Sequence, residues 1–321
     1  MHIDVHAHYF PRDYLDMMTR FGAQSPRSVP MAPGAQVTLP ERLALMDDAG
    51  IDMQVLSVAA VQPYLAEAAN AVEAARAAND LYADVCKEHQ GRFAAFGTVP
   101  LPHVDAALAE VERCLDRLGM LGITTGCSVA GRTLDSPEFA PFWEELNRRR
   151  AVLFLHPVGA GAGPGTADYG LTWMIGAPIE DTIVALRLVL SGVVARYPDV
   201  RIIVPHLGGT IPFLFQRIDD QNERRSDAAT EELPELATTY LKRLWYDTVN
   251  RNPAALRCSC DAFGADRILL GTDWPYLAGP KFKHCVTYVE EAGLSEQERE
   301  DILGNNAAAL LGLDQKARTG G

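Results

Sequence analysis

Short apolar runs recur eight times along the chain, and each is at most seven residues long. Runs of β-branched and aliphatic residues of this length are typical of strands that are covered on both faces. They occupy residues 2–6, 53–58, 93–99, 121–125, 152–156, 201–206, 244–249 and 267–272. Stretches with apolar residues at i, i+3 and i+4 lie between them, at 41–48, 64–88, 104–118, 138–150, 179–196, 211–224 and 253–263. Strand followed by helix throughout predicts parallel crossovers that close into a (β/α)8 TIM barrel.

Two segments interrupt this alternation. Residues 9–39 form an irregular stretch with Pro and Gly after the first run, and residues 159–165 (GAGAGPG) follow the fifth. Because both follow strands, we expect both to overhang the mouth of the barrel, with 9–39 as an insertion that helps to cover a substrate. Helices are expected over 295–313, with Ser295 as N-cap and Glu298 at the capping-box position.

Composition is consistent with one large globular unit. The chain has 321 residues, of which 48% are hydrophobic and 22% charged, and no Pro-, Gly- or Ser-rich linker divides it. Single α/β barrels commonly reach about 250 residues or more. We therefore expect one domain over 1–321. The six cysteines include no CxxC pair, which favours reduced thiols.

Net charge narrows the class of partner. With 29 Lys and Arg against 42 Asp and Glu, the formal charge is −13, which repels both a phosphate backbone and an anionic bilayer. The sequence therefore predicts a small-molecule partner, with neither nucleic acid nor a membrane. No basic segment followed by a long apolar stretch opens the chain, and no run of about 18 uncharged apolar residues follows, so a cytoplasmic location is expected.

Chemistry-bearing residues gather where the predicted strands end. His6 and His8 come at the end of the first run, His156 ends the fifth, His206 ends the sixth, and Asp273 follows the eighth. The carboxyl ends of barrel strands meet at one face, so these side chains should become neighbours. In an extended segment His6 and His8 share one face, which lets one ion take both imidazoles. The pattern predicts a metal site.

Imidazole and carboxylate ligands suit Zn²⁺ best, with Mn²⁺ or Fe²⁺ as alternatives. We expect one ion, because the fourth run (LGITTGC) offers no lysine or carboxylate to bridge a second. If His6, His8, His156 and Asp273 are the ligands, His206 is free to act as base on a metal-bound water, whose pKa falls to about 7 on zinc.

The sequence motifs around these residues resemble those of a known family. MHIDVHAHYFP, FLHP, VPHLGG and LGTDWPY are similar to the amidohydrolase superfamily, and more narrowly to its branch with 2-amino-3-carboxymuconate-6-semialdehyde decarboxylase. The resemblance covers nearly the whole chain. It implies a substrate-contacting arginine at Arg42, an arginine that reaches across a homodimer interface at Arg217, and aromatic pocket residues at Trp173 and Tyr276. The segment HPVGAGAG replaces a bulkier, aromatic-containing sequence of the family, at a place where substrate identity is set.

The resemblance implies a carbon–carbon lyase, a metal-dependent decarboxylase that acts on an unsaturated or aromatic acid without an organic cofactor. His206 would assist a metal-bound hydroxide that adds to the conjugated system, or Asp273 would shuttle the ring proton; the sequence leaves both routes open. Arginines at positions 42 and 217 would hold the small anionic substrate, since guanidinium groups match carboxylate geometry. The same hydroxide could instead serve a hydrolase or hydratase acting on a lactone, amide or C–C bond. A binding protein with a vestigial site is the third alternative.

Overall fold

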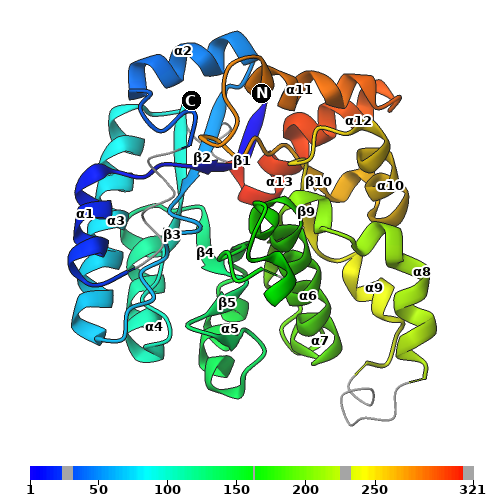
Figure 1. Ribbon diagram of the computed structural model, residues 1–321, viewed down its shortest axis with the longest axis horizontal. Helices are drawn as coiled ribbons and strands as arrows, with labels where there is room; N and C mark the ends of the chain where they lie inside the picture. The colour runs from blue at the N-terminus through cyan, green and yellow to red at the C-terminus, as the bar shows by residue number, and fades with distance from the viewer. Residues whose placement is uncertain (24–31, 162, 225–232, 314–321) are drawn as a thin grey trace.

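The computed structural model describes residues 1–23, 32–161, 163–224 and 233–313, and its centre is a barrel of parallel strands (Figure 1). Eight strands pair in the order β1-β2-β3-β4-β7-β8-β9-β10, with every neighbouring pair parallel. They are β1 (Ile3–His8), β2 (Met53–Ser57), β3 (Phe93–Thr98), β4 (Gly122–Gly126), β7 (Val152–His156), β8 (Arg201–Val204), β9 (Trp245–Asp247) and β10 (Ile268–Leu269). The backbone N–H of Val5 donates to the carbonyl of Leu270 at 2.9 Å, which joins the first strand to the last. The predicted (β/α)8 barrel is confirmed.

The strands form because both of their faces are buried. One set of apolar side chains fills the inside of the barrel, among them Val5, Val55, Phe96, Phe154 and Ile203. The alternate positions pack outward against the helices in a second, larger apolar layer. Full burial of one such side chain stabilises the fold by about 1.5–3 kcal/mol. This two-sided burial explains why the strands read as nearly continuous apolar runs.

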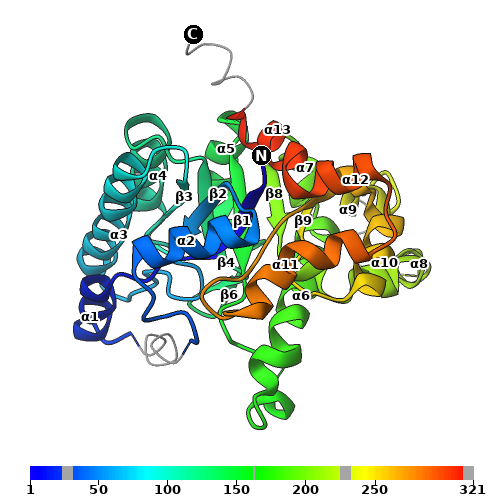
Figure 2. The same cartoon turned by 90° about the horizontal axis from the view of Figure 1, so that it is seen from above.

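Helices surround the barrel (Figure 2). They are α1 (Arg12–Arg20), α2 (Leu39–Ala49), α3 (Ala68–Glu88), α4 (Val104–Glu112), α5 (Ala140–Arg148), α6 (Ala177–Leu190), α7 (Val193–Arg196), α8 (Ile211–Asn222), α9 (Ala237–Leu241), α10 (Pro253–Phe263), α11 (Pro280–Glu291), α12 (Glu296–Glu300) and α13 (Asn306–Leu311). Short helical turns occur at Arg113–Arg117, Pro137–Phe139, Pro164–Thr166, Thr172–Gly176, His206–Gly208, Ala265–Arg267 and Asp301–Asn305. Among the described residues, none of these helices has the length and apolar character needed to span a bilayer.

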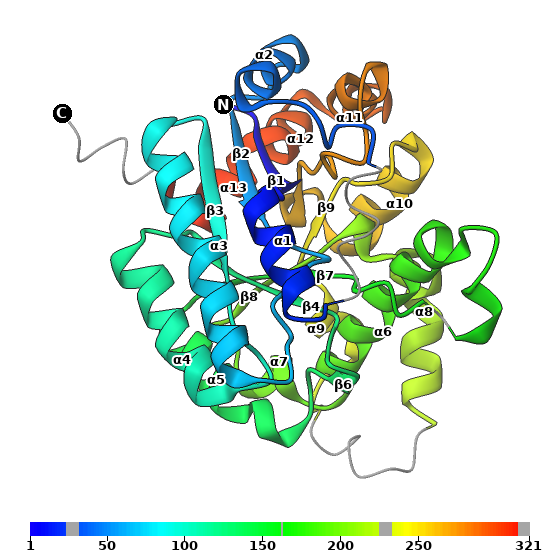
Figure 3. The same cartoon turned by 60° about the vertical axis from the view of Figure 1, so that its left-hand side comes forward.

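Several expected boundaries need correction. The stretch 9–39 was expected to be irregular, yet it contains α1, which lies beside α3 (Figure 3). The expected helix over 179–196 divides into α6 and α7 at Gly192, whose φ of 76° is left-handed. Helices α9 and α11 and the small hairpin of β5 (Ser128–Val129) and β6 (Arg132–Thr133) were not predicted. Residues 24–31, 162, 225–232 and 314–321 of the expected segments and domain lie outside the described residues.

The helix start at Ser295 is confirmed. Its hydroxyl accepts a hydrogen bond from the backbone N–H of Glu298, and the Glu298 side chain accepts one from the N–H of Ser295. This reciprocal pair satisfies two donors that the first turn of α12 would otherwise leave free. The C-terminal helices therefore begin at the predicted residue.

Candidate active site

Four side chains from three parts of the barrel meet at the carboxyl ends of the strands. They are His6 and His8 on β1, His156 at the end of β7, and Asp273 after β10, and their ligand atoms all lie within 4.8 Å of one another. The Nε2 atoms of His6 and His8 are 3.2 Å apart. Oδ1 of Asp273 lies 3.3 Å from the first and 3.1 Å from the second. The structure brings together the four residues predicted as ligands and places both β1 imidazoles on one face.

The unused nitrogens of this cluster fit a divalent cation. His156 donates from Nδ1 to the carbonyl of Pro157 at 2.8 Å, while its buried Nε2 has no hydrogen-bond partner among the described residues. His6 donates from Nδ1 to Oδ2 of Asp247 at 2.7 Å, which leaves its Nε2 as a lone-pair donor. A buried polar atom without a partner costs free energy, and coordination to a cation would remove that cost. Three imidazole nitrogens and a carboxylate oxygen are a donor set for Zn²⁺ or Mn²⁺.

Electrostatics at the cluster also favour a positive charge. Burial opposes protonation of His6, but Asp247 and then Asp273 outweigh it and raise its pKa to about 10. Burial lowers the pKa of His8 to about 4, and burial together with the neighbouring imidazoles holds the pKa of His156 well below its usual value. Burial would raise the pKa of Asp273, yet its contacts with the two β1 imidazoles keep it well below the usual range. Asp273 is therefore ionised and His8 and His156 are neutral, as metal binding requires, and a bound cation would take the place of the proton that the raised pKa of His6 retains.

His206 faces the same cluster without belonging to it. Its ring centroid lies 5.3 Å from that of His6 and 6.0 Å from that of His156. Its Nδ1 pairs with Oδ2 of Asp181 at 2.7 Å, so Nε2 is the ring nitrogen left for chemistry. Burial lowers the pKa of His206, but Asp181 more than compensates and raises it.

The backbone at His206 is held in an unusual conformation. Its φ is 55°, in the left-handed region that costs a non-glycine residue of order 1 kcal/mol or more. A hydrogen bond from its N–H to Oδ1 of Asp247 at 2.9 Å stabilises this conformation. Because Asp247 also accepts a hydrogen bond from His6, one carboxylate orients both a predicted metal ligand and the neighbouring imidazole.

A cavity of about 340 Å³ opens beside the cluster. We name it the ligand cavity; it is lined by Ala32, Pro33, His156, Trp173, Ala177, His206, Asp273 and Tyr276. Both predicted aromatic residues therefore lie with the predicted catalytic residues. The glycine-rich segment that begins at Gly159 lies against Trp173, since a Cβ at Gly159 would come within 2.8 Å of the Trp173 ring. The described part of 9–39 reaches the cavity through Ala32 and Pro33.

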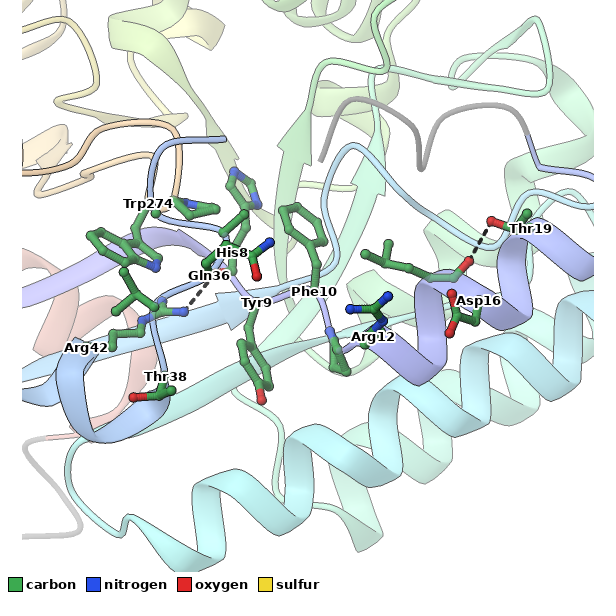
Figure 4. Close-up of a pocket in the computed structure, with 16 residues that line it drawn as sticks. His8, Tyr9, Phe10, Arg12, Asp16, Thr19, Gln36, Thr38, Arg42 and Trp274 are labelled. Carbon is green, nitrogen blue, oxygen red and sulfur yellow. Dashed lines mark hydrogen bonds between the residues drawn. The ribbon is translucent and has the colours of Figure 1, made fainter. Parts of the chain in front are cut away.

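The two predicted arginines lie elsewhere. Arg42 on α2 is only 2% exposed, and it donates to Oε1 of Gln54 at 2.7 Å and to the carbonyl of His8 at 2.8 Å. It lines a second cavity of about 490 Å³, which we name the α1 cavity and which includes His8 and Trp274 (Figure 4). Arg217 is exposed on α8 and lines neither of these two cavities of the described chain.

Four buried polar residues that support the site were not predicted: Asp4, Gln54, Asp181 and Asp247. Asp4 and Asp247 carry a signal, because a carboxylate inside an apolar strand is rarely buried without a function or a partner. Asp181 carries none, since a carboxylate in the first turns of a helix usually faces solvent. Its pairing with His206 appears only when α6 packs against the turn His206–Gly208.

The chain belongs to the amidohydrolase family, whose profile matches residues 3–313. It is 31% identical to a 2-amino-3-carboxymuconate-6-semialdehyde decarboxylase from Dictyostelium discoideum, over 82% of this chain and 74% of that protein. It is 33% identical to a gamma-resorcylate decarboxylase from Rhizobium sp. (strain MTP-10005), over 85% of this chain and 86% of the relative. The resemblance to the amidohydrolases and to this branch is confirmed.

A solved structure extends the comparison to the fold. The dihydroxybenzoic acid decarboxylase from Polaromonas sp. JS666, with bound manganese and the inhibitor 2-nitroresorcinol, superposes with a TM-score of 0.83 at 27% identity. The match covers 98% of this chain and 97% of that one. The shared architecture therefore extends through the barrel and its helices.

Proposed function

We propose that this chain is a metal-dependent carboxy-lyase that decarboxylates an aromatic or unsaturated carboxylic acid without an organic cofactor. The observation that carries the proposal is the cluster of His6, His8, His156 and Asp273 opening onto a cavity with two aromatic walls. Curated relatives named as decarboxylases support the reaction type. Zn²⁺ is the ion we propose, with Mn²⁺ as the alternative, which the manganese-bound relative supports.

The four ligands would hold one divalent ion, which supplies a Lewis acid and lowers the pKa of a bound water. In the overall reaction the carboxyl group leaves as CO₂, the electron pair stays on the former α-carbon, and a proton takes the place of the carboxyl group. His206 and Asp273 both line the ligand cavity, so both face the space that the substrate would occupy. We assign His206 the role of base or proton donor, with its Nδ1 held by Asp181 and its Nε2 exchanging the proton.

Substrate binding is assigned to the cavity walls. Trp173 and Tyr276 offer flat apolar surfaces that suit a planar conjugated acid. The small size of Gly159 and Gly161 lets the loop approach Trp173 and Thr166 closely. The substrate class proposed is thus a small, flat carboxylate.

We propose further that the chain acts as a homodimer in which Arg217 binds the carboxylate of the neighbouring subunit's substrate. Arg217 lies one helical turn after Phe213, whose side chain is 86% exposed. Other exposed apolar side chains are Met174, in the turn before α6, and Ile183 within α6, and both α6 and α8 contact α9. Exposed apolar residues of this kind support an interface between subunits.

The test is to remove the ion with a chelator and to measure CO₂ release from a panel of hydroxybenzoic and muconic acids. We expect release by the metal-loaded protein, loss of it in the apo protein, and recovery when Zn²⁺ or Mn²⁺ is added. Full activity of the apo protein would contradict the proposal. Cleavage of a lactone or amide without CO₂ release would replace the decarboxylase assignment with a hydrolase.

A further inference from the structure

A chain of buried polar groups contacts the backbone beside the ligand cluster, and none of its members lines the ligand cavity. We name it the Asp4 network; its members are Asp4 on β1, Arg42 on α2, Gln54 on β2 and Thr272 after β10. Each member is at most 2% exposed. The proposed reaction uses none of these groups as an acid, a base or a metal ligand. The burial of four connected polar side chains therefore needs another explanation.

The hydrogen bonds run without a break from one charge to the other. Asp4 accepts at Oδ2 from Nε2 of Gln54 at 2.7 Å and from the hydroxyl of Thr272 at 2.6 Å. Oε1 of Gln54 accepts from Nε of Arg42 at 2.7 Å. A buried cation and a buried anion are thus joined through one amide, which reduces the cost of removing both from water. The guanidinium also lies over the Phe93 and Trp274 rings, at 5.5 and 5.6 Å from their centroids.

Every end of the network contacts the backbone of a ligand-bearing segment. Oδ1 of Asp4 accepts from the N–H of His6 at 3.1 Å and from the N–H of Thr272, directly before Asp273, at 3.0 Å. Arg42 donates from Nη1 to the carbonyl of His8 at 2.8 Å, as Figure 4 shows. One connected set of side chains therefore makes hydrogen bonds to the backbone of the segments that carry three of the four predicted ligands, His6, His8 and Asp273.

We infer that the Asp4 network positions the ligand-bearing backbone and thereby sets the affinity of the site for its divalent ion. The inference rests on the metal site of the proposed function. It makes Arg42 a positioning residue, because two of its nitrogens are used in holding His8 and Gln54. Its remaining nitrogen, Nη2, has no partner among the described residues, so the substrate contact expected from the sequence stays a prediction that the same experiment tests.

The first experiment compares Gln54→Leu with Asn79→Leu. Asn79 is a matched control, since its buried amide donates to the carbonyl of Thr98 and to Glu110 at 2.8 and 2.7 Å but contacts no ligand-bearing segment. Both variants should have a lower melting temperature, because each leaves buried partners unpaired. Only Gln54→Leu should weaken metal binding, by about 10- to 100-fold in the dissociation constant for Zn²⁺ measured against a chromogenic chelator.

The outcomes separate the two proposals. If the wild-type protein binds no ion, both the proposed metal site and the proposed role of the Asp4 network are contradicted. A wild type that binds Zn²⁺ while folded Gln54→Leu binds it equally well overturns the inference alone, and so does an equal loss in Asn79→Leu. If Gln54→Leu does not fold, Thr272→Val replaces it, since valine keeps the shape and removes only the hydroxyl. Unchanged affinity in Thr272→Val then overturns the inference.

Arg42→Lys tests the positioning role against substrate contact. Lysine keeps the charge, but its one ammonium group cannot reproduce both the Nε and the Nη1 hydrogen bonds. Positioning predicts a weaker Zn²⁺ complex, with the KM of the metal-saturated enzyme within about 3-fold of wild type. A KM raised more than 10-fold at unchanged Zn²⁺ affinity would overturn the positioning role and restore the substrate contact.

Discussion

The pair formed by Asp181 and His206 can be tested with one isosteric substitution, Asp181→Asn. The carboxylate is fully buried, and its Oδ2 lies 2.7 Å from Nδ1 of the imidazole. Asparagine keeps the size of the side chain but removes the charge that stabilises the protonated ring. The amide can also present its NH₂ group to Nδ1, which would move the ring proton to Nε2, the atom that faces the cluster.

The expected loss follows from the strength of this contact. A hydrogen bond to a charged group contributes about 1.5–3 kcal/mol. Each 1.36 kcal/mol in the barrier is a factor of ten in rate, so kcat should fall about 10- to 150-fold if His206 carries a proton in the rate-limiting step. Asp181 raises the pKa of His206, so its removal lowers that pKa and should move the corresponding limb of the pH–rate profile to lower pH.

The assay is CO₂ release under saturating metal, with metal content determined on the same samples. Cys127→Ala is the control, because the Cys127 thiol contacts the other oxygen of Asp181 at 3.5 Å and its loss leaves the imidazole contact in place. We expect that control to stay within about 3-fold of wild type, since the thiol is a weak donor. Wild-type kcat in Asp181→Asn would refute the base assignment. Loss of the ion in that variant would place Asp181 in metal retention instead.

Three further results are expected. Exchanging His6 and His8 together for Ala should reduce bound metal below about 0.2 equivalents while far-UV circular dichroism stays unchanged, because the barrel core does not depend on the ion. Arg217→Ala should raise KM about 10- to 100-fold, and mixing it with His206→Ala should recover up to about a quarter of wild-type activity, since each hybrid dimer regains one complete site; no recovery argues against a shared site. The hydrogen bond with Arg148 is the largest of the causes that lower the pKa of Glu145 to about 2. The contribution of ionised Glu145 to folding stability is therefore full above pH 4.5 and is lost as pH falls toward 2. Glu145→Gln should therefore melt about 2 °C lower at pH 7 and match wild type near pH 2, and an equal difference at both pH values would contradict this.

The sequence sufficed to predict the barrel and its ligands because both signals are local. A strand buried on both faces must be apolar along its whole length, and a histidine at its end is visible in the same few letters. His8 and His156 end β1 and β7, His6 lies two residues before the end of β1, and Asp273 follows β10 in the same short segment of sequence. Their convergence then follows from closure of the barrel alone.

Partners that depend on packing could not be predicted. Asp181 and His206 are 25 residues apart in the sequence. They meet only because α6 packs against the turn His206–Gly208. Two missed helices differ in kind. α1 buries only Tyr14 and Met18, too few to show a period, whereas α11 buries Phe282, Cys285, Val286 and Val289 at helical spacing and was identifiable. Its position after the last strand places it outside the strand–helix alternation that predicts helices between the strands.

The distance along the chain between His8 and Asp273, 265 residues, has a consequence for biosynthesis. His6 and His8 are among the first residues to be synthesised. Asp273, whose carboxylate completes the predicted ligand set, is added only when most of the polypeptide has been made. A nascent or truncated chain that stops before residue 273 therefore presents at most the three imidazoles. The complete four-ligand site therefore forms only after residue 273 has been made and the two ends of the barrel have met.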